Sequence, residues 1–367
     1  MSLPLNSGMK LETLGKERTN MKWYEKCNNN CNGVIISSRI RLARNLMNYP
    51  FPNSIGDYEA ELMVNQINQA MFSANEYTND FFELINMQEI KQVEKMAMME
   101  RHVISPHFIS MKRPTSLILS KDESISIMIN EEDHIRIQSL ETGMNLSDAL
   151  DNANKVDDLL SEKLTYAFDE KLGFLTACLT NLGTGLRASY MVHLPALETS
   201  GQLKFLLDAV SKFGLTVRGI YGEGSEAQGS IFQISNQLTL GVNEQEIIDN
   251  LTTVTMQIVD QELVVRNKFL NERRLEFEDA IYRSYGILCN ARVLSSKEAM
   301  TLLSDIKLGV ELGILNIIGD KTINIFELMT CIQPANLQKI EMKNLSLKER
   351  DIARADFVRE HIANLIK

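Results

Sequence analysis

Short apolar runs bounded by polar turns occupy the chain from Val34 to about residue 241, and no such run follows. Six of them have the length and composition of β-strands: 34–38, 115–120, 124–130, 173–178, 189–195 and 231–241. In the run 124–130, Ile125, Ile127 and Ile129 fall on one face of a strand. Predicted helices at 56–74, 148–164 and 200–214 lie between the runs without regular alternation. This order predicts an α+β fold with a largely antiparallel sheet.

Helical signals replace strand signals after residue 243. Asn243 and Glu246 have capping-box spacing and open a helical stretch to about residue 273, and further capping boxes open at Ser295 and Ser346. Residues before Val34 are polar and rich in asparagine, which predicts a poorly ordered lead-in. The distribution of strand and helix signals therefore predicts a polar lead-in at 1–33, a mixed α/β domain at 34–264 and a helical C-terminal domain at 265–367.

Composition limits the setting of the protein. The chain has 367 residues, 44% of them hydrophobic, and a net charge of −10, which argues against nucleic-acid binding by bulk electrostatics. Its five cysteines do not form a disulfide framework, and no apolar run has membrane length, so we expect a cytoplasmic protein without membrane contact. Cys27 and Cys31 resemble half of a metal site, but no second ligand pair follows, so we expect no dedicated metal site.

Five arginines are the main candidates for a binding site. Arg39 and Arg41 follow the strand 34–38 and would share one of its faces, where an exposed basic edge is the simpler interpretation. A binding site becomes the better interpretation when Arg136, Arg187 and Arg218 are added. Each of these lies in or beside an apolar run, where an unpaired charge is costly. A triphosphate would satisfy all five. The chain has no GxxxxGK[ST] motif, so arginines rather than a glycine-rich loop would hold the phosphates.

Acids and a thiol accompany these arginines. The acidic run Glu131, Glu132 and Asp133 would ordinarily be a surface turn, but it continues an apolar strand, so at least one acid is expected to face the site. Glu223 lies between two glycines in a loop that is either a lid or a plain surface loop. Cys178 is either a buried small residue or a reactive thiol beside the polar turn TNLGTG. Carboxylates beside phosphate-binding arginines suggest phosphoryl transfer to a basic group.

Five ordered blocks carry a resemblance to a known family. They are SSRIRLAR (37–44), NEEDHIRI (130–137), LGFLTACLTNLGTGLRAS (172–189), RGIYGEGSEAQGS (218–230) and ISNQLTLG (234–241). They resemble the catalytic blocks of the phosphagen (guanidino) kinases, over about residues 34–264. Within that superfamily the chain is most similar to the bacterial protein-arginine kinases, because the first block arrives early and RSYGIL (283–288) and an RDxxRA motif follow. The family usually has proline after the cysteine, where this chain has Leu179.

The resemblance implies a fold and a reaction. It implies an antiparallel sheet flanked by helices, a helical C-terminal domain, and transfer of the ATP γ-phosphate, with Mg²⁺, to arginine side chains of proteins. Glu132 and Glu223 would hold the guanidinium, one of them accepting its proton, and Cys178 would support it. The residues assigned to ATP are Ser37, Ser38, Arg39, Ile40, Arg41, His102, Arg136, Arg187, Ala188, Ser189, Tyr190, Met191, Arg218, Gly219, Ile220, Tyr221, Gly222 and Glu223, with His102 against the base. A kinase of small guanidino compounds and a non-catalytic phosphoarginine-binding adaptor remain the alternatives.

The C-terminal motif implies regulation. It consists of Arg350, Asp351, Ile352, Ala353, Arg354 and Ala355. Arg350 and Arg354 share one helix face and would hold a phosphate, while Asp351 would hold a guanidinium, although an ordinary charged helix face is the simpler interpretation. The inward stripe of that helix would consist of Ile352, Ala355, Val358 (or Arg359), Ile362 and Leu365. The implied partners are unfolded proteins and a heat-shock repressor as substrates, a zinc-binding activator, a Clp unfoldase or protease, and a second copy of the chain, in a stress response that controls protein quality.

Overall fold

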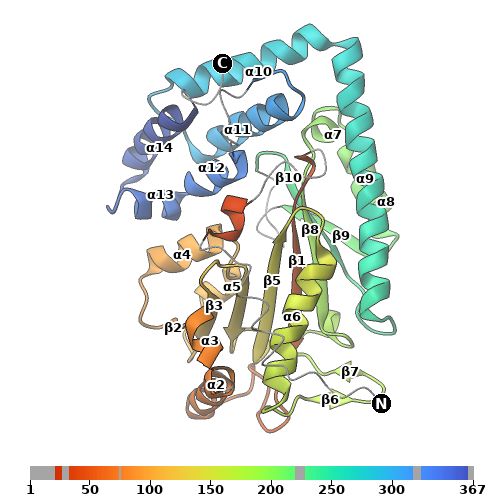
Figure 1. The fold of residues 1–367 in the computed structure, drawn as a ribbon, viewed down its shortest axis with the longest axis vertical. Helices are drawn as coiled ribbons and strands as arrows, with labels where there is room; N and C mark the ends of the chain where they lie inside the picture. The colour runs from red at the N-terminus through yellow and green to blue at the C-terminus, as the bar shows by residue number, and fades with distance from the viewer. Residues whose placement is uncertain (1–20, 27–32, 74–75, 220–227, 317–323, 363–367) are drawn as a thin grey trace.

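The computed structural model describes residues 21–26, 33–73, 76–219, 228–316 and 324–362. Its centre is an eight-stranded sheet in the order β2-β3-β4-β5-β1-β8-β10-β9, in which every pair of neighbours is antiparallel. The strands are β1 (Ile35–Arg44), β2 (Phe82–Asn86), β3 (Ser116–Ser120), β4 (Ile125–Ile129), β5 (Ile135–Thr142), β8 (Leu186–His193), β9 (Leu215–Gly219) and β10 (Ile231–Asn236). The prediction of an α+β fold with an antiparallel sheet and a helical C-terminal region is confirmed (Figure 1).

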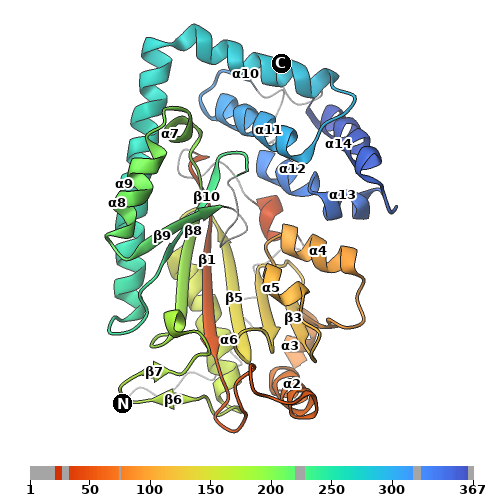
Figure 2. The same cartoon turned by 180° about the vertical axis from the view of Figure 1, so that it is seen from behind.

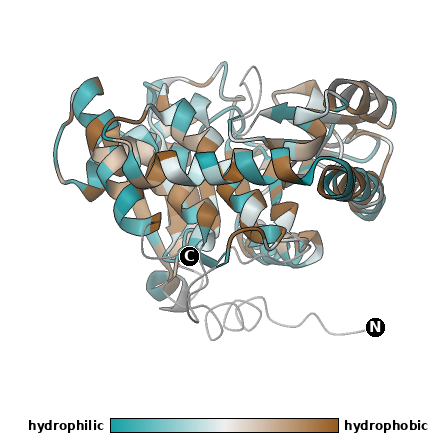
Figure 3. Cartoon of the chain, turned by 90° about the horizontal axis from the view of Figure 1, so that it is seen from above, coloured by the Kyte–Doolittle hydropathy of each residue, from teal (hydrophilic) through white to brown (hydrophobic). Residues whose placement is uncertain are grey.

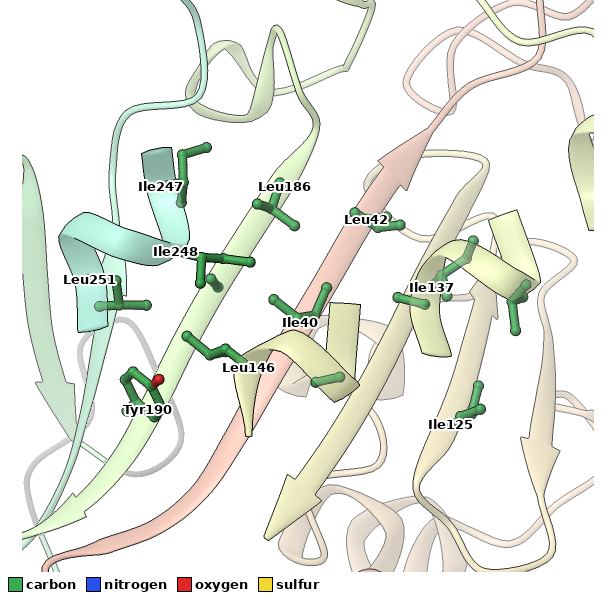
Figure 4. Close-up of a cluster of buried hydrophobic side chains, with 14 of the residues drawn as sticks. Ile40, Leu42, Ile125, Ile137, Leu146, Leu186, Tyr190, Ile247, Ile248 and Leu251 are labelled. Atoms are coloured by element: carbon green, nitrogen blue, oxygen red, sulfur yellow. The ribbon is translucent and has the colours of Figure 1, made fainter. Parts of the chain in front are cut away.

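Three helices cover one face of the sheet. They are α2 (Asp57–Phe72), α6 (Leu146–Ser161) and the long α9 (Glu244–Glu272). Figure 4 shows Ile40 and Leu42 of β1 pointing toward this layer, where Leu146 of α6 and Leu251 of α9 lie in the same buried cluster. Because side chains alternate along a strand, Arg39 and Arg41 point to the opposite face. Each fully buried aliphatic side chain stabilises this layer by about 1.5–3 kcal/mol, so the core also fixes the direction of the arginines.

One predicted strand is wrong over most of its length. In the run 173–178 only Gly173–Phe174 is a strand, β7, which pairs with β6 (Phe168–Asp169) in a short hairpin. The rest forms a loop that leads into the 3-10 helix η3 (Leu179–Asn181). The backbone N–H of Ala177 donates to the Asp133 carboxylate at 2.7 Å and not to a neighbouring strand. A contact from a distant turn thus overrides the local strand propensity.

The C-terminal region is a helical layer at one end of the sheet (Figures 1 and 2). It contains α10 (Arg274–Asn290), α11 (Ser296–Glu311), α12 (Ile325–Cys331), α13 (Pro334–Ile340) and α14 (Leu347–Ile362). Brown and teal residues alternate around these helices in the view from above, as amphipathic helices require (Figure 3). Their buried cluster includes Ile36, Leu140, Met191 and Ile231 of the sheet, so the two regions share apolar packing.

The predicted helix starts agree with the caps. At α9 both hydrogen bonds of the Asn243–Glu246 capping box form, at 2.9 and 3.0 Å. Helix α9 then runs without a break across residues 264 and 265, and the helix path changes only at Arg273. The division at 264/265 therefore stays a prediction. None of the described helices is long and apolar enough to cross a membrane.

Helix α14 deviates from its predicted stripe at Ile352. Ala355, Val358 and Ile362 are buried as expected, but Ile352 is exposed. Arg354 takes the inward position instead, because its guanidinium can satisfy carbonyl groups of the preceding segments, which an isoleucine cannot. Leu365 lies outside the described residues.

Candidate functional site

Five arginines from four strands line one cavity. In the strand register Arg41 lies opposite both Gln138 of β5 and Arg187 of β8, and Arg218 of β9 lies opposite Gln233 of β10. These positions share the sheet face opposite to α2, α6 and α9. The cavity has a volume of about 390 Å³ and is lined by Arg39, Arg41, Met99, His102, Ile104, Ser105, Pro106, His107, Met128, Glu131, Glu132, Arg136, Gln138, Arg187, Arg218, Gln233 and Ser235.

The positive charges in this cavity oppose one another. Burial, and then the charges of Arg187 and Arg136, lower the pKa of Arg39 to about 10, although its guanidinium also donates to Gln233 Oε1 at 2.5 Å. Burial, and then Arg39, Arg136 and Arg187, lower the pKa of Arg41 well below its usual range. The Nε atom of Arg41 is buried without a hydrogen-bond partner among the described residues. Such a cluster is costly by itself and suits a ligand with several negative charges.

The acidic run contributes one half-exposed carboxylate beside the arginines. Glu131 and Glu132 both contact the guanidinium of Arg136, with N–O distances of 2.6 and 2.9 Å. Glu131 is buried and also accepts a hydrogen bond from Ser105, whereas the Glu132 side chain is 38% exposed. Glu132 is therefore the carboxylate of this pair that an incoming group can reach.

Asp133 serves the scaffold of the site. Its Oδ1 atom accepts hydrogen bonds from Asn45 Nδ2 at 2.6 Å and from the backbone of Ala177 at 2.7 Å. Burial raises the pKa of Asp133, and these two hydrogen bonds oppose that change. Asp133 thus joins the acidic turn to the loop that carries Cys178. The sequence patterns gave no signal for Asn45, whose role depends on contacts between segments that are distant in sequence.

His134 has a fixed, neutral ring. Its Nδ1 atom accepts from the backbone of Leu46 at 2.9 Å, and Nε2 lies 2.9 Å from the carbonyl oxygen of Pro50, to which it donates. Burial lowers the pKa of His134 to about 4, although the bond to Pro50 acts in the other direction. His134 therefore fixes the loop after β1 and does not face the cavity.

Cys178 belongs to a second, smaller chamber. This chamber of about 110 Å³ is lined by Arg41, Ala43, Glu132, Arg136, Cys178, Thr180, Asn181, Gly185 and Arg187. Arg41, Glu132, Arg136 and Arg187 line both chambers, so they stand at the boundary between the two. The Sγ atom of Cys178 lies 3.0 Å from Thr180 Oγ1. The half-buried thiol thus faces the same space as Glu132, while the next residue, Leu179, points into solvent.

The turn after Cys178 requires glycine where it approaches neighbouring backbone. Gly183 has φ +111°, and a Cβ atom there would lie 2.3 Å from the carbonyl oxygen of Thr239. Gly185 has φ +65°, and its Cβ atom would lie 2.6 Å from the carbonyl oxygen of Ala43. Side chains are excluded at both positions on steric grounds. The glycines of TNLGTG therefore let the Cys178 turn pack directly against β1 and the segment after β10.

His102 lines the large cavity. It follows α4 (Gln92–Glu100) and has φ 62°, an uncommon backbone conformation for a residue other than glycine. Burial, with a contribution from Arg39, lowers the pKa of His102 to about 3, so the ring is neutral. Met99, Ile104 and Met128 line the cavity with it. A neutral ring among apolar side chains suits a flat aromatic ligand group.

Several residues that the resemblance assigned to ATP lie elsewhere. Ile40, Ala188 and Tyr190 belong to the hydrophobic core on the opposite face, and Met191 packs against the C-terminal region. Ser38 is buried and donates to the carbonyl oxygen of Gly143 at 2.7 Å. The remaining assigned residues that do not line the cavity are Ser37, Ser189 and Gly219; the Oγ of Ser189 lies 3.4 Å from the Nε of Arg39. The side chains of Ile40, Ala188 and Tyr190 point away from the cavity because of strand alternation. Ser189 acts on the site only through its contact with Arg39.

The second carboxylate of the predicted site cannot be placed. Ile220, Tyr221, Gly222 and Glu223 lie outside the described residues. Among the residues that the structure does describe, no group of three His, Cys, Asp or Glu side chains could hold a metal ion. Cys27 and Cys31 also lie outside that part of the chain.

The two arginines of the C-terminal motif have different environments. Arg354 is buried and donates to the carbonyl oxygens of Leu294 and Ile332 at 2.8 and 2.9 Å, and it pairs with Asp351 at 2.6 Å. Arg350 is half-buried, and its Nε atom has no hydrogen-bond partner among the described residues. Burial raises the pKa of Glu100 in α4, and Arg350 is one of the groups that oppose this rise, which places Arg350 and Glu100 within electrostatic range. Of the pair, Arg350 is the one with a donor to offer a ligand.

Comparison with known proteins agrees with this geometry. The model of the ATP:guanido phosphotransferase C-terminal catalytic domain matches residues 63–264. Among solved structures, a lombricine kinase aligns with a TM-score of 0.56 at 23% identity over 65% of this chain and 68% of that one. A duplicated taurocyamine kinase from Schistosoma mansoni aligns with a TM-score of 0.58 at 21% identity over 75% of this chain and 40% of that one. Fold and site together define a guanidino phosphotransferase.

The C-terminal region and the related sequences indicate which kind of guanidino phosphotransferase this is. The model of the protein-arginine kinase McsB C-terminal domain matches residues 274–367. A protein-arginine kinase of Clostridium kluyveri is 46% identical over 93% of this chain and 98% of its own length. One of Halalkalibacterium halodurans is 47% identical over 90% of this chain and 92% of its own length. The chain belongs to the protein-arginine kinase family.

Proposed function

We propose that this protein transfers the γ-phosphate of ATP to the guanidinium groups of arginine residues in proteins. One observation carries the proposal: the chamber with five arginines and the chamber with Cys178 meet at Glu132, Arg136, Arg41 and Arg187. A polyanion on one side and a guanidinium on the other would bring their reacting groups together at that boundary. Family membership supports the same reaction.

The nucleotide would occupy the larger chamber. Its base would lie beside the neutral ring of His102, and its phosphates would accept hydrogen bonds from the arginines, whose mutual repulsion the phosphates would relieve. Mg²⁺ would enter bound to the phosphates and neutralise part of their charge. The two carboxylates in the chamber, Glu131 and Glu132, are both engaged with Arg136, which fits a metal carried by the nucleotide.

The acceptor guanidinium would occupy the smaller chamber. A guanidinium is a poor nucleophile while it is charged, because its pKa lies above about 12. Glu132 would orient it and accept a proton from the attacking nitrogen, and Glu223 would serve as a second carboxylate. The N–P bond then forms as the bond between the γ-phosphorus and the bridging oxygen breaks, and ADP leaves. Cys178 would support the guanidinium from the chamber wall, and alignment would supply most of the rate.

The C-terminal region would bind the reaction product. We assign phosphoarginine to the RDxxRA segment. Arg350 would be the main hydrogen-bond donor to its phosphate, and Arg354 would position the helix. On the strength of the family resemblance we also propose a cytoplasmic, dimeric and allosteric enzyme of the stress response. Its proposed partners are a zinc-binding activator, a heat-shock repressor as a substrate, and a Clp protease that receives the marked proteins.

Mass spectrometry under conditions that preserve acid-labile phosphoarginine tests the function. The protein is incubated with ATP, Mg²⁺ and an unfolded protein, and in parallel with free arginine. Phosphoarginine in the protein and much less product from free arginine is the expected result. The reverse preference would identify a small-molecule guanidino kinase. Binding of phosphoarginine with no ATP turnover on either acceptor would identify an adaptor.

A further inference from the structure

Exposed large apolar side chains lie on and beside the turn that carries Cys178 and Thr180, two residues that line the small chamber. Leu179 is 81% exposed, Leu238 60%, Leu240 49% and Phe213 55%. We call these four residues the apolar rim. Isolated exposed leucines are common on protein surfaces, but a group from three separate segments gathered at one place marks an interaction site.

Hydrogen bonds hold two of the rim segments together. Thr239 is buried between Leu238 and Leu240 in sequence, and its hydroxyl lies 3.1 Å from the carbonyl oxygen of Thr180 and 2.7 Å from that of Leu182. The backbone N–H of Thr184 donates to the carbonyl oxygen of Thr239 at 3.1 Å. Because Thr239 points inward, its two leucine neighbours are exposed beside the turn that begins at Leu179.

The third segment joins through Gly214. The backbone N–H of Gln237 donates to the carbonyl oxygen of Gly214 at 2.8 Å. A Cβ atom on Gly214 would lie 2.9 Å from Cδ1 of Leu238, so the leucine lies over this glycine, which follows Phe213 in the sequence. These contacts join the segments that carry Leu179, Leu238 and Phe213. Thr180, which follows Leu179, lines the small chamber.

The small chamber constrains what lies on the rim. A volume of about 110 Å³ admits the end of an arginine side chain but no backbone. The backbone that carries the arginine must therefore lie across the mouth, and the neighbouring side chains must contact the surface around it. Burying an apolar neighbour on the rim gains free energy in proportion to the area removed from water, whereas a polar neighbour gains little.

We propose that the apolar rim selects arginines that have apolar neighbours in an extended polypeptide. This inference rests on the proposed function and specifies its substrate class. In a folded protein an apolar neighbour of a surface arginine usually points into the core. Both side chains are accessible together mainly where the chain is unfolded. The rim thus provides a physical means of recognising an unfolded segment at the site of phosphoryl transfer.

Paired peptides test the proposal. The two peptides have equal length and charge and one arginine each, flanked by leucines in one and by serines in the other. We expect the parent protein to use the leucine-flanked peptide with a kcat/KM at least about tenfold higher. Leu179→Ser combined with Leu238→Ser should reduce this ratio to near one, mainly through KM, and should leave turnover of N-acetylarginine amide unchanged. Leu240→Ser is a second rim variant should the first fold poorly.

A matched control separates the rim from general surface effects. Leu275 on α10 is 80% exposed, like Leu179, but is distant in the fold, so Leu275→Ser should keep the parent's ratio. A parent ratio near one, or a ratio unchanged in both rim variants, would overturn the proposal. An equal loss on both peptides and on N-acetylarginine amide would also overturn it, because it would indicate a displaced Cys178 turn.

Binding measurements distinguish failure of the inference from failure of the proposed function. Fluorescence anisotropy of the labelled peptides needs no phosphoryl transfer. A preference for the leucine-flanked peptide that the rim variants lose would support the rim even if no phosphoarginine formed, and the absence of product would then count against the kinase alone. Equal binding of both peptides by the parent counts against the rim, whatever the activity.

Discussion

Arg41 shows how an individual residue is fixed for function at a cost to stability. Its neighbours along β1 are core residues that determine its direction, yet its guanidinium is buried among three other cations and its Nε has no hydrogen-bond partner among the described residues. Arg44 on the same strand is more deeply buried than Arg41, but it pairs with Asp157 at 2.7 Å and lies over the ring of Phe174. The protein thus provides a carboxylate partner for the charge of Arg44, whereas Arg41 lies among other positive charges.

Replacement of these two arginines by methionine should have opposite effects. Arg41→Met should raise the free energy of unfolding without nucleotide by about 1–3 kcal/mol, because an uncompensated buried charge is replaced by an apolar side chain. It should also abolish the stabilisation that ATP confers on the parent. Arg44→Met should lower the stability by about 3–5 kcal/mol, because it leaves Asp157 unpaired. Chemical denaturation with and without ATP measures both, and a destabilised Arg41→Met would contradict this account of the cavity.

Glu132→Gln tests the proposed proton acceptor. The substitution keeps the shape of the side chain and one acceptor for Arg136 but removes the base, so we expect kcat to fall at least about 100-fold. The half-exposed position of Glu132 predicts little change in stability or in ATP affinity. Stopped-time phosphoarginine assays and ATP titrations check this. Normal turnover would remove Glu132 from the mechanism.

Strand alternation is why the arginines could be predicted from sequence and their neighbours could not. Arg39 and Arg41 alternate with Ile40 and Leu42, so the sequence alone indicates that they share a face. Asn45 and Gln233 are ordinary polar residues whose contacts arise only when the sheet order brings distant strands together. The burial of Arg354 also depends on carbonyl groups from other segments, which no local pattern encodes.

Among the elements, helix α4 has the most informative contacts. The carboxylate of Glu100, at its end, accepts hydrogen bonds from the backbone of Ala335 and Asn336 at 2.8–3.0 Å, at the N-terminus of α13. The next two residues are Arg101, which donates to Asn336 at 2.9 Å, and His102, which lines the large cavity. One short element thus touches both the C-terminal region and the candidate nucleotide site.

Glu100 should make this contact sensitive to pH. Burial raises the pKa of Glu100 to about 7, so between its ordinary value of 4.5 and about 7 the folded state binds more protons than the unfolded state. Its contribution to stability is therefore present below pH 4.5 and is lost as the pH rises to about 7, at about 1.4 kcal/mol per unit of pKa shift. Glu100→Gln should remove this part of the dependence of Tm on pH. Glu94→Gln, on a partly exposed position of the same helix, is the control and should retain it.

At the scale of the whole molecule, the C-terminal motif tests whether the two regions have separate tasks. Arg350→Ala should weaken binding of free phosphoarginine about ten- to a hundredfold, because it removes charge-assisted hydrogen bonds to the phosphate, and should leave Tm nearly unchanged. Arg354→Ala should lower the stability by about 3–5 kcal/mol, because Arg354 is a buried residue with three hydrogen bonds. Calorimetry and thermal unfolding separate the two roles. Equal phosphoarginine affinity in Arg350→Ala and the parent would reduce the motif to a packing element.

Truncation should show that the region that contains the sheet does not fold well alone. A chain that ends at residue 264 loses Arg266, which pairs with Glu262 at 2.7 Å, and Glu262 in turn accepts hydrogen bonds at the start of the short helix α7 (Pro195–Thr199). A chain that ends at residue 273 keeps these contacts but still uncovers Ile36, Met191 and Ile231. We expect poor solubility for both and a worse outcome for the shorter chain. Yield and circular dichroism of the two truncations measure this.

The continuous helix α9 bears on how such a protein can change in evolution. At about 1.5 Å per residue its 29 residues form a rod roughly 44 Å long that belongs to both regions. The end of the sheet that packs against the C-terminal helices is apolar, so deletion of those helices would expose a surface that promotes aggregation. Recombination inside α9 would interrupt a helix that both regions share. Recombination between related genes is therefore expected to be tolerated at the break at Arg273. Related proteins should differ by exchange of the whole region after that residue and not of a part of α9.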